Sequence, residues 1–129
     1  MLAQLATRKT IRGNVPRIPF EKLLRAVFPQ GYELSLVICG DDLARSINKK
    51  YRKKTYAANV LSFPLSKTEG ELFLNVRCSE REARSFGVSR ESRLALLFVH
   101  GLFHLKGLHH GRTMEREERR VLRAYKLGD

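Results

Sequence analysis

Apolar and polar residues alternate at several places in the chain, which is the pattern of a half-buried strand. The clearest case is Glu33–Cys39, where Leu34, Leu36 and Ile38 occupy every second position. Further strands are expected at 2–10, 59–63 and 71–76. The first of these is the weakest, and 59–63 ends at Pro64, a residue that limits strand pairing.

Apolar residues at helical spacing predict five helices, at residues 19–28, 41–52, 79–86, 93–106 and 111–126. Pro19 suits a first helical turn, and Asp41 and Ser89 are residue types that cap helix N-termini. The segment 93–106 is apolar on almost all sides, and such a helix is usually buried. The mixed order of elements predicts an α+β fold, with a small mixed sheet packed against a buried central helix and the other helices around it.

The composition is that of an ordinary globular chain. Its 129 residues are 43% hydrophobic and 29% charged, which suits one domain over residues 1–129. Cys39 and Cys78 are too few for a disulfide scaffold. The N-terminus lacks the long apolar core of a secretory signal, and the apolar stretch 94–105 is too short to cross a bilayer. We therefore expect a cytoplasmic protein with no membrane partner.

The charge is unusual, because 25 Lys and Arg residues face 13 Asp and Glu residues, a net charge of +12. A field of this sign attracts polyanions, with RNA, DNA and anionic membrane as candidates, although basic residues can also serve only solubility. The densest basic cluster surrounds Arg52 and consists of Lys49, Lys50, Lys53 and Lys54.

All four histidines fall within residues 100–110. His100 and His104 are four residues apart, so a helix places them on one face, and Gly107 permits the chain reversal that returns His110 to them. Three imidazoles with an open fourth position are the ligand set of a catalytic zinc site. Nickel, copper or iron would also suit these ligands. His109 is a candidate fourth or substitute ligand, but we expect it to lie outside the first ligand shell or on the surface.

The spacing is similar to the metzincin signature, His-Glu-x-x-His-x-x-Gly-x-x-His. All three ligands and the glycine coincide, but Gly101 stands where the proteases have their general-base glutamate. Without that carboxylate, nothing at this position takes the proton from water. The motif therefore favours metal-assisted hydrolysis and disfavours peptide hydrolysis. The alternative is that the histidines are only hydrogen-bonded core residues.

Residues 100–110, His-Gly-Leu-Phe-His-Leu-Lys-Gly-Leu-His-His, resemble the hallmark His-Gly-x-x-His-Leu-x-Gly-x-x-His of the YbeY family of metal-dependent endoribonucleases. Residues 47–52 and 59–64 resemble the family's second block, which runs from Leu-Asn-x-x-Tyr-Arg to Val-Leu-Ser-Phe-Pro. Residues 70–74 and the acidic final helix add to the likeness, which covers about residues 34–127. Two departures are Leu108-His109, where the family usually has Tyr-Asp, and Ala58, where it usually has Thr.

The resemblance implies one zinc ion per chain, held by His100, His104 and His110, and an essential arginine that falls on Arg52. It also implies a single-strand-specific endoribonuclease that acts in small-subunit rRNA maturation and ribosome quality control, with the ribosome or its small subunit as partner. An arginine is suited to this role, because its guanidinium can hold a phosphate through two hydrogen bonds. The four lysines around it would attract the RNA backbone.

Several further residues are expected near the site. Ser62 and Phe63 end a strand beside the cleft, and Phe63 is either a stacking surface for a base or a core residue. Asn59 is expected to fix its loop by hydrogen bonds, and Gly107 to turn the chain. Met114 is a candidate floor under the metal, or simple packing. Glu115 and Glu118 are candidates for a distant acid or base, but we expect them to pair with Arg119 and Arg123 on the helix surface.

Two other functions fit parts of the sequence. A metallopeptidase would use the same ligands, and Gly101 and the positive charge argue against it. A non-catalytic RNA- or ribosome-binding protein would use zinc only for stability, and the open three-ligand site argues against that.

Overall fold

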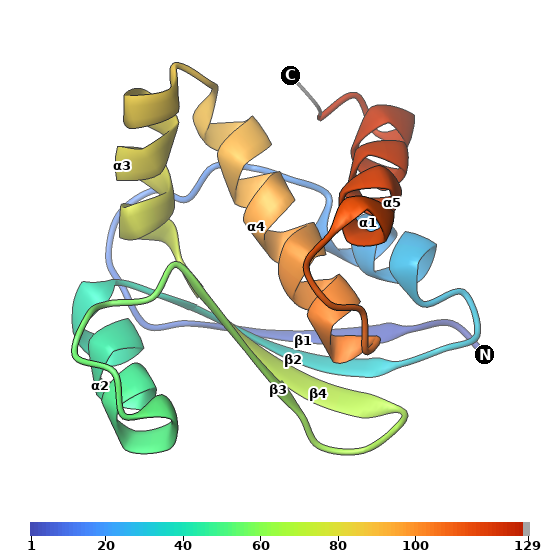
Figure 1. Ribbon diagram of the computed structural model, residues 1–129, viewed down its shortest axis with the longest axis horizontal. Coiled ribbons are helices and arrows are strands. Elements are labelled where there is room, and N and C mark those ends of the chain that lie inside the picture. The colour runs from blue at the N-terminus through green and yellow to red at the C-terminus, as the bar shows by residue number, and fades with distance from the viewer. Residues whose placement is uncertain (128–129) are drawn as a thin grey trace.

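The computed structural model describes residues 1–127 and contains one four-stranded sheet and five helices over that range (Figure 1). The elements in chain order are β1 Gln4–Lys9, α1 Phe20–Val27, β2 Glu33–Cys39, α2 Asp41–Arg52, β3 Val60–Pro64, β4 Glu69–Asn75, α3 Val76–Phe86, α4 Arg90–Leu105 and α5 Arg112–Ala124. The predicted α+β fold with a mixed sheet is confirmed.

The strands lie in the order β1-β2-β4-β3. β1, β2 and β4 are parallel, and β3 pairs antiparallel with β4, its hairpin partner. Pro64 is the last residue of β3 and lies opposite Gly70. A proline is tolerated there because β3 is an edge strand.

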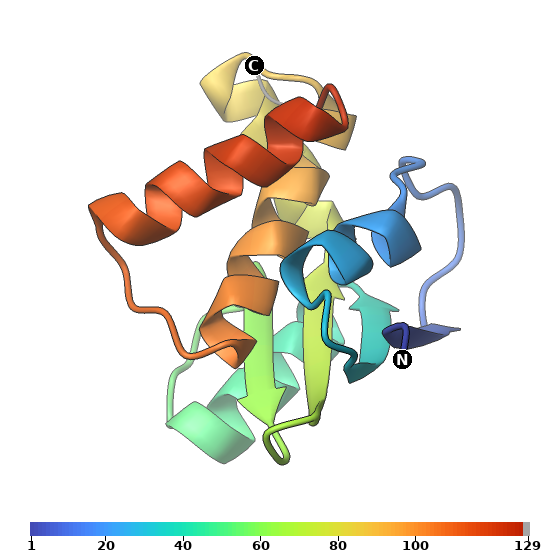
Figure 2. The ribbon, with the colours of Figure 1, turned by 90° about the vertical axis from the view of Figure 1, so that its right-hand side faces the viewer.

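Four helices, α1, α3, α4 and α5, lie on one side of the sheet, and α2 lies on the other (Figures 1 and 2). The alternation predicted for β2 accounts for these two layers. Leu34, Leu36 and Ile38 point into the core under α4, whereas Val37 and Cys39 belong to a smaller cluster with Ala44 of α2 and other residues.

Helix α4 is the centre of the molecule, as its apolar sequence predicted. Nine of its residues are buried, including Leu94, Phe98 and Leu102, which have no exposed surface. Ser89 caps its N-terminus by accepting a hydrogen bond from the Ser92 N–H at 3.0 Å. The helix that carries the histidines is therefore held rigidly by the core.

Several element boundaries differ from expectation by one to three residues, and the start of α3 is the case with a clear local cause. Val76, assigned to a strand by its pattern, is the first residue of α3, which begins three residues earlier than predicted. The cause is Asn75, whose side chain accepts a hydrogen bond from the Cys78 N–H at 3.1 Å and caps the helix. Within residues 1–127, no helix is both long and apolar enough to cross a membrane.

Candidate metal centre

His100 and His104 lie one turn apart on α4, and their rings face each other. The two Nε2 atoms are 3.1 Å apart, and both residues are half-buried. Two Zn–N bonds in tetrahedral geometry would place the nitrogens about 3.3 Å apart. The spacing of four residues therefore already supplies half of a metal site.

The chain reversal predicted at Gly107 brings His110 to the other two histidines. The Gly107 N–H donates to the His104 carbonyl and the Leu108 N–H donates to the Phe103 carbonyl, both at 3.0 Å, which is a Schellman ending to α4. Gly107 has φ +98°, a conformation that L side chains rarely adopt. The ring centroid of His110 then lies 4.8 Å from that of His100 and 4.7 Å from that of His104.

The three imidazoles form a donor set suited to one metal ion. One ring nitrogen from each of them lies within 4.8 Å of the others. The set can occupy three positions of a tetrahedral ion and leave the fourth open. His109, by contrast, is exposed, and the triad does not include it.

Glu118 of α5 completes the surroundings of His100. Its Oε2 lies 2.5 Å from His100 Nδ1, and the residue is 7% exposed. A carboxylate at Nδ1 keeps the proton on that nitrogen and leaves Nε2 with a free lone pair directed at His104. This partner fixes the tautomer that a metal ligand needs.

The expectation that Glu118 pairs with arginines on the helix surface is therefore wrong. The sequence held a signal for this: Glu118 falls in the stripe of α5 that also carries Met114, Val121 and Leu122, all buried. A carboxylate on a buried stripe requires a specific partner. Glu115, the other acid considered, is exposed.

The electrostatics keep His104 neutral near physiological pH. Burial is the largest cause that lowers the pKa of His104, and the neighbouring His100 and His110 lower it further. The neutral imidazole is the form that binds a metal.

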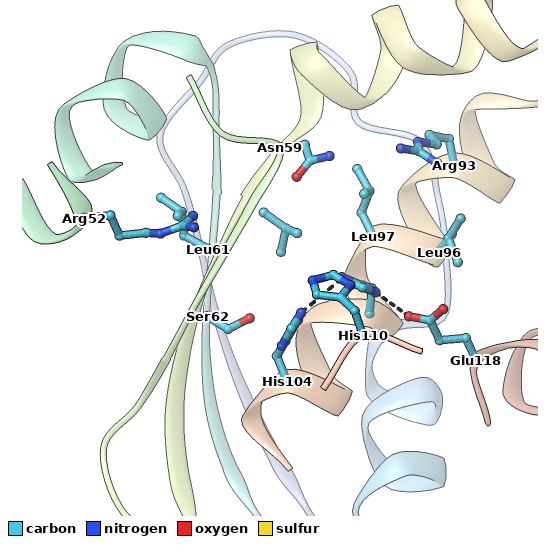
Figure 3. Close-up of a pocket in the computed structure, with 12 residues that line it drawn as sticks. Arg52, Asn59, Leu61, Ser62, Arg93, Leu96, Leu97, His104, His110 and Glu118 are labelled. Carbon is cyan, nitrogen blue, oxygen red and sulfur yellow. Dashed lines mark hydrogen bonds and ion pairs between the residues drawn. The ribbon is translucent and has the colours of Figure 1, made fainter. Parts of the chain in front are cut away.

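The triad opens into a cavity of about 600 Å³ (Figure 3). Arg52 reaches toward it from α2, on the opposite side from Glu118 (Figure 3). Among residues 1–127, no acidic side chain lies within ion-pair distance of Arg52. The other lining residues are Asn59, Val60, Leu61, Ser62, Arg93, Leu96 and Leu97.

Gly101 allows α4 to approach the sheet closely at this cavity. A Cβ there would lie 2.6 Å from Leu72 Cδ1 and 3.1 Å from Ser62 Oγ. Ser62 Oγ instead donates to the Gly101 carbonyl at 3.0 Å. Position 101 thus faces the sheet, and a glutamate side chain would not fit there without displacing β3 or β4.

The remaining predicted residues lie at different distances from the triad. Asn59 lines the cavity and donates from Nδ2 to Glu82 Oε2 at 3.2 Å, as expected for a residue that fixes its loop. Met114 is buried in the main core. Phe63 is half-buried, outside the cavity lining, and packs against Tyr51 and Phe73.

The four lysines of the basic cluster are all exposed and none lines the cavity. They surround the C-terminal end of α2, from which Arg52 extends. Arg52 therefore lines the cavity, whereas the four lysines lie on the neighbouring surface.

Sequence reasoning missed Arg93, which lines the cavity from α4. Its guanidinium pairs with Glu82, with Nη2 to Oε1 at 2.9 Å, and Glu82 also accepts from Asn59. Because that pair neutralises Arg93, its main effect is to hold α3, α4 and the start of β3 together. A single arginine at the start of an almost wholly apolar segment gave no sequence signal for this contact.

Comparison with known proteins finds matches to one family over most of the chain. The family model described as "Endoribonuclease YbeY" matches residues 7–126. A protein named Endoribonuclease YbeY from Methylibium petroleiphilum is 36% identical, over 92% of this chain and 85% of that protein. Its namesake from Aquifex aeolicus is 35% identical, over 98% of this chain and 89% of that protein.

Among solved structures, the solution structure of TM1509 from Thermotoga maritima has the same fold, with a TM-score of 0.63 at 23% identity. The match covers 82% of this chain and 80% of that one. Taken with the histidine triad and the two sequence blocks, these matches establish that the chain belongs to the YbeY endoribonuclease family.

Proposed function

We propose that this chain is a metal-dependent endoribonuclease that cleaves single-stranded RNA. The observation that carries the proposal is the convergence of three imidazoles beside an arginine that has no acidic partner among residues 1–127, in one cavity. The names of its relatives support the same activity. We further propose a role in small-subunit rRNA maturation and ribosome quality control, in the cytoplasm and with the ribosome as partner, as the family resemblance implies.

The metal in this proposal is one zinc ion per chain, held by His100, His104 and His110. When bound, zinc supplies a Lewis acid next to the phosphodiester. Glu118 holds the proton on His100 Nδ1 throughout, so that Nε2 stays available as a ligand. Burial keeps His104 in its neutral form.

Arg52 binds the scissile phosphate in this mechanism. Its guanidinium can donate two hydrogen bonds to phosphate oxygens and offset the negative charge that grows on them during cleavage. The cavity walls of Val60, Leu61, Leu96 and Leu97 lower the local dielectric constant, which strengthens that interaction. Lysine would supply the charge but not the paired geometry.

The test is cleavage of an end-labelled single-stranded RNA by protein of known zinc content. We expect cleavage at about one zinc per chain, and none with His104→Ala or Arg52→Ala. Two matched controls are His109→Ala, an exposed histidine outside the triad, and Arg45→Ala, an arginine of the same helix that pairs with Asp42. Both should cleave like the wild type.

Other outcomes would overturn the proposal. Equal cleavage by the wild type and His104→Ala would assign the activity to a contaminant. Zinc binding and RNA binding without cleavage, on naked RNA and on isolated small subunits alike, would favour the non-catalytic binding protein. Zinc-dependent digestion of casein would favour the peptidase, for which position 101 offers no general base.

A further inference from the structure

The C-terminal end of α2 and the loop after it carry exposed basic side chains with two tyrosines among them. Residues 43–68 contain seven Lys and Arg residues and no Asp or Glu. We call the following seven residues the basic-aromatic surface: Lys49, Lys50, Tyr51, Arg52, Lys53, Lys54 and Tyr56. None of its five cations has an ion-pair partner within residues 1–127.

Both tyrosines of this surface are exposed to solvent rather than packed in the core. Tyr51 is 58% exposed and Tyr56 is 55% exposed, although Tyr32, elsewhere in the chain, is 4% exposed. Tyr51 makes one edge contact with another aromatic ring, Phe63, with ring centroids 5.4 Å apart, and Lys50 Nζ lies 5.1 Å from the centroid of the Tyr51 ring. Phe63 itself is half-buried between Tyr51 and Phe73, so the two exposed tyrosines offer more ring surface than Phe63 does.

Hydrogen bonds to Asn48 of α2 hold the loop that carries Tyr56 in place. Asn48 has no exposed surface, and its Nδ2 donates to the Tyr56 carbonyl at 2.9 Å. The Lys54 N–H also donates to the Asn48 carbonyl, and Lys53 adopts the left-handed conformation with φ 56° that ends α2. A loop fixed in this way presents its ring without a large ordering cost on binding.

The basic-aromatic surface is continuous with the cavity. Arg52 belongs to both, since it lines the cavity (Figure 3) and follows Tyr51 in α2. Strand β3 borders both the basic-aromatic surface and the cavity, and it is an edge strand that ends in Pro64. A strand of RNA with one phosphate at Arg52 can therefore cross the edge of the sheet and continue along α2.

We propose that Tyr51 and Tyr56 stack on bases that flank the scissile phosphate, while the lysines between them neutralise the adjoining phosphates. This inference rests on the proposed function, because it takes single-stranded RNA as the substrate. Stacking on exposed aromatic rings is tolerant of sequence and needs unpaired bases. The surface would thus select single strands before any bond is broken.

Binding is measured with metal-free protein, so that no cleavage occurs, by the fluorescence anisotropy of a labelled 12-nucleotide single-stranded RNA. We expect Tyr51→Ala and Tyr56→Ala each to weaken binding about tenfold, and Tyr→Phe at each position to restore it, because the ring remains. The matched control is Phe86→Ala on α3, an exposed ring with Arg93 over its face at 4.8 Å. It should leave the affinity unchanged.

A thermodynamic cycle with RNA that lacks bases separates stacking from charge. Removal of the stacked bases should weaken binding by the wild type about as much as the alanine variants do, and should weaken the variants little further. Affinity that is unchanged in Tyr51→Ala and Tyr56→Ala, with wild-type cleavage intact, would overturn the stacking surface and leave the proposed function standing. Absence of any RNA binding by the wild type would overturn both.

Discussion

At the scale of single residues, the site depends on side chains whose sequence neighbours do not reveal their partners. His100 and His104 are related by helical spacing alone, but Glu118 reaches His100 from a different helix. Gly101 lies between the two ligands and determines how closely α4 approaches β3 and β4. Substitution at either of these positions tests whether the neighbours of the ligands control metal binding and stability.

Glu118→Ala is expected to weaken zinc binding by about 10- to 100-fold, because His100 loses the partner that fixes its tautomer and ring orientation. Competition with a chromophoric chelator measures this affinity without any enzymatic assay. Glu117→Ala is the matched control, since Glu117 lies beside it and pairs with Arg120 on the surface. Equal zinc affinities in the two variants would show that Glu118 does not orient His100.

Gly101→Ala is expected to destabilise the fold by about 1–2 kcal/mol. Overpacking against Leu72 costs about 1–3 kcal/mol, and the better helix propensity of alanine returns at most about 1 kcal/mol. Urea unfolding of the metal-free protein measures the change. Leu72→Val removes the obstructing Cδ1, so Gly101→Ala should cost less in that background. The same cost in both backgrounds would contradict this account.

At the scale of elements, local sequence patterns predicted the elements themselves better than the contacts between them. The helical spacing of His100 and His104 and the break at Gly107 lie within eleven residues, so the triad could be predicted from sequence. The contact of Glu118 with His100 depends on how α5 crosses α4, and no local pattern encodes that crossing. The start of α3 was missed because Asn75 both ends β4 and caps the helix.

The N-terminus of α2 is tied to α3 by an ion pair that gives a pH-dependent prediction. Arg81 donates to both oxygens of Asp41 at 2.8 and 2.9 Å, and this is the main cause that lowers the pKa of Asp41 in the folded chain. Because the folded pKa lies below the unfolded value of about 3.9, the stabilisation is present above that pH. It is lost as the pH falls through the folded pKa.

Asp41→Asn is therefore expected to lower the free energy of unfolding by up to about 1 kcal/mol at pH 7, a small effect because the pair is partly exposed. The difference from the wild type should shrink as the pH falls below about 4. Urea unfolding at a series of pH values measures both. Asp42→Asn is the control, since Asp42 faces Arg45 at 3.7 Å with its side chain fully exposed. A pH-independent difference would show that the carboxylate charge of Asp41 is not the cause of the effect.

At the scale of the whole molecule, the charge is distributed unevenly along the chain. The net charge of +12 includes a segment, residues 43–68, that contains seven basic residues and no Asp or Glu. This segment contains the end of α2 and all of β3, which border the cavity at the edge of the sheet. The positive charge that suggested a polyanionic partner therefore includes an acid-free segment that borders the candidate site.

The salt dependence of RNA binding tests whether this segment is the electrostatic footprint. If the five cations of the basic-aromatic surface each neutralise one phosphate, the logarithm of the association constant should fall with the logarithm of salt concentration with a slope of about −3.5. Lys53→Gln together with Lys54→Gln should reduce the magnitude of that slope by about 1.4. Filter binding over a range of KCl concentrations measures it.

The control for this prediction is a second pair of exposed cations, Arg8→Gln with Arg17→Gln. Arg8 lies on β1, at the opposite edge from β3, and both arginines are exposed. The two double variants remove the same net charge, so a general attraction to the whole molecule would reduce the slope equally in both. A change confined to the Lys53 and Lys54 variant would place the RNA backbone along α2, because only ions released at the contact surface contribute to the slope.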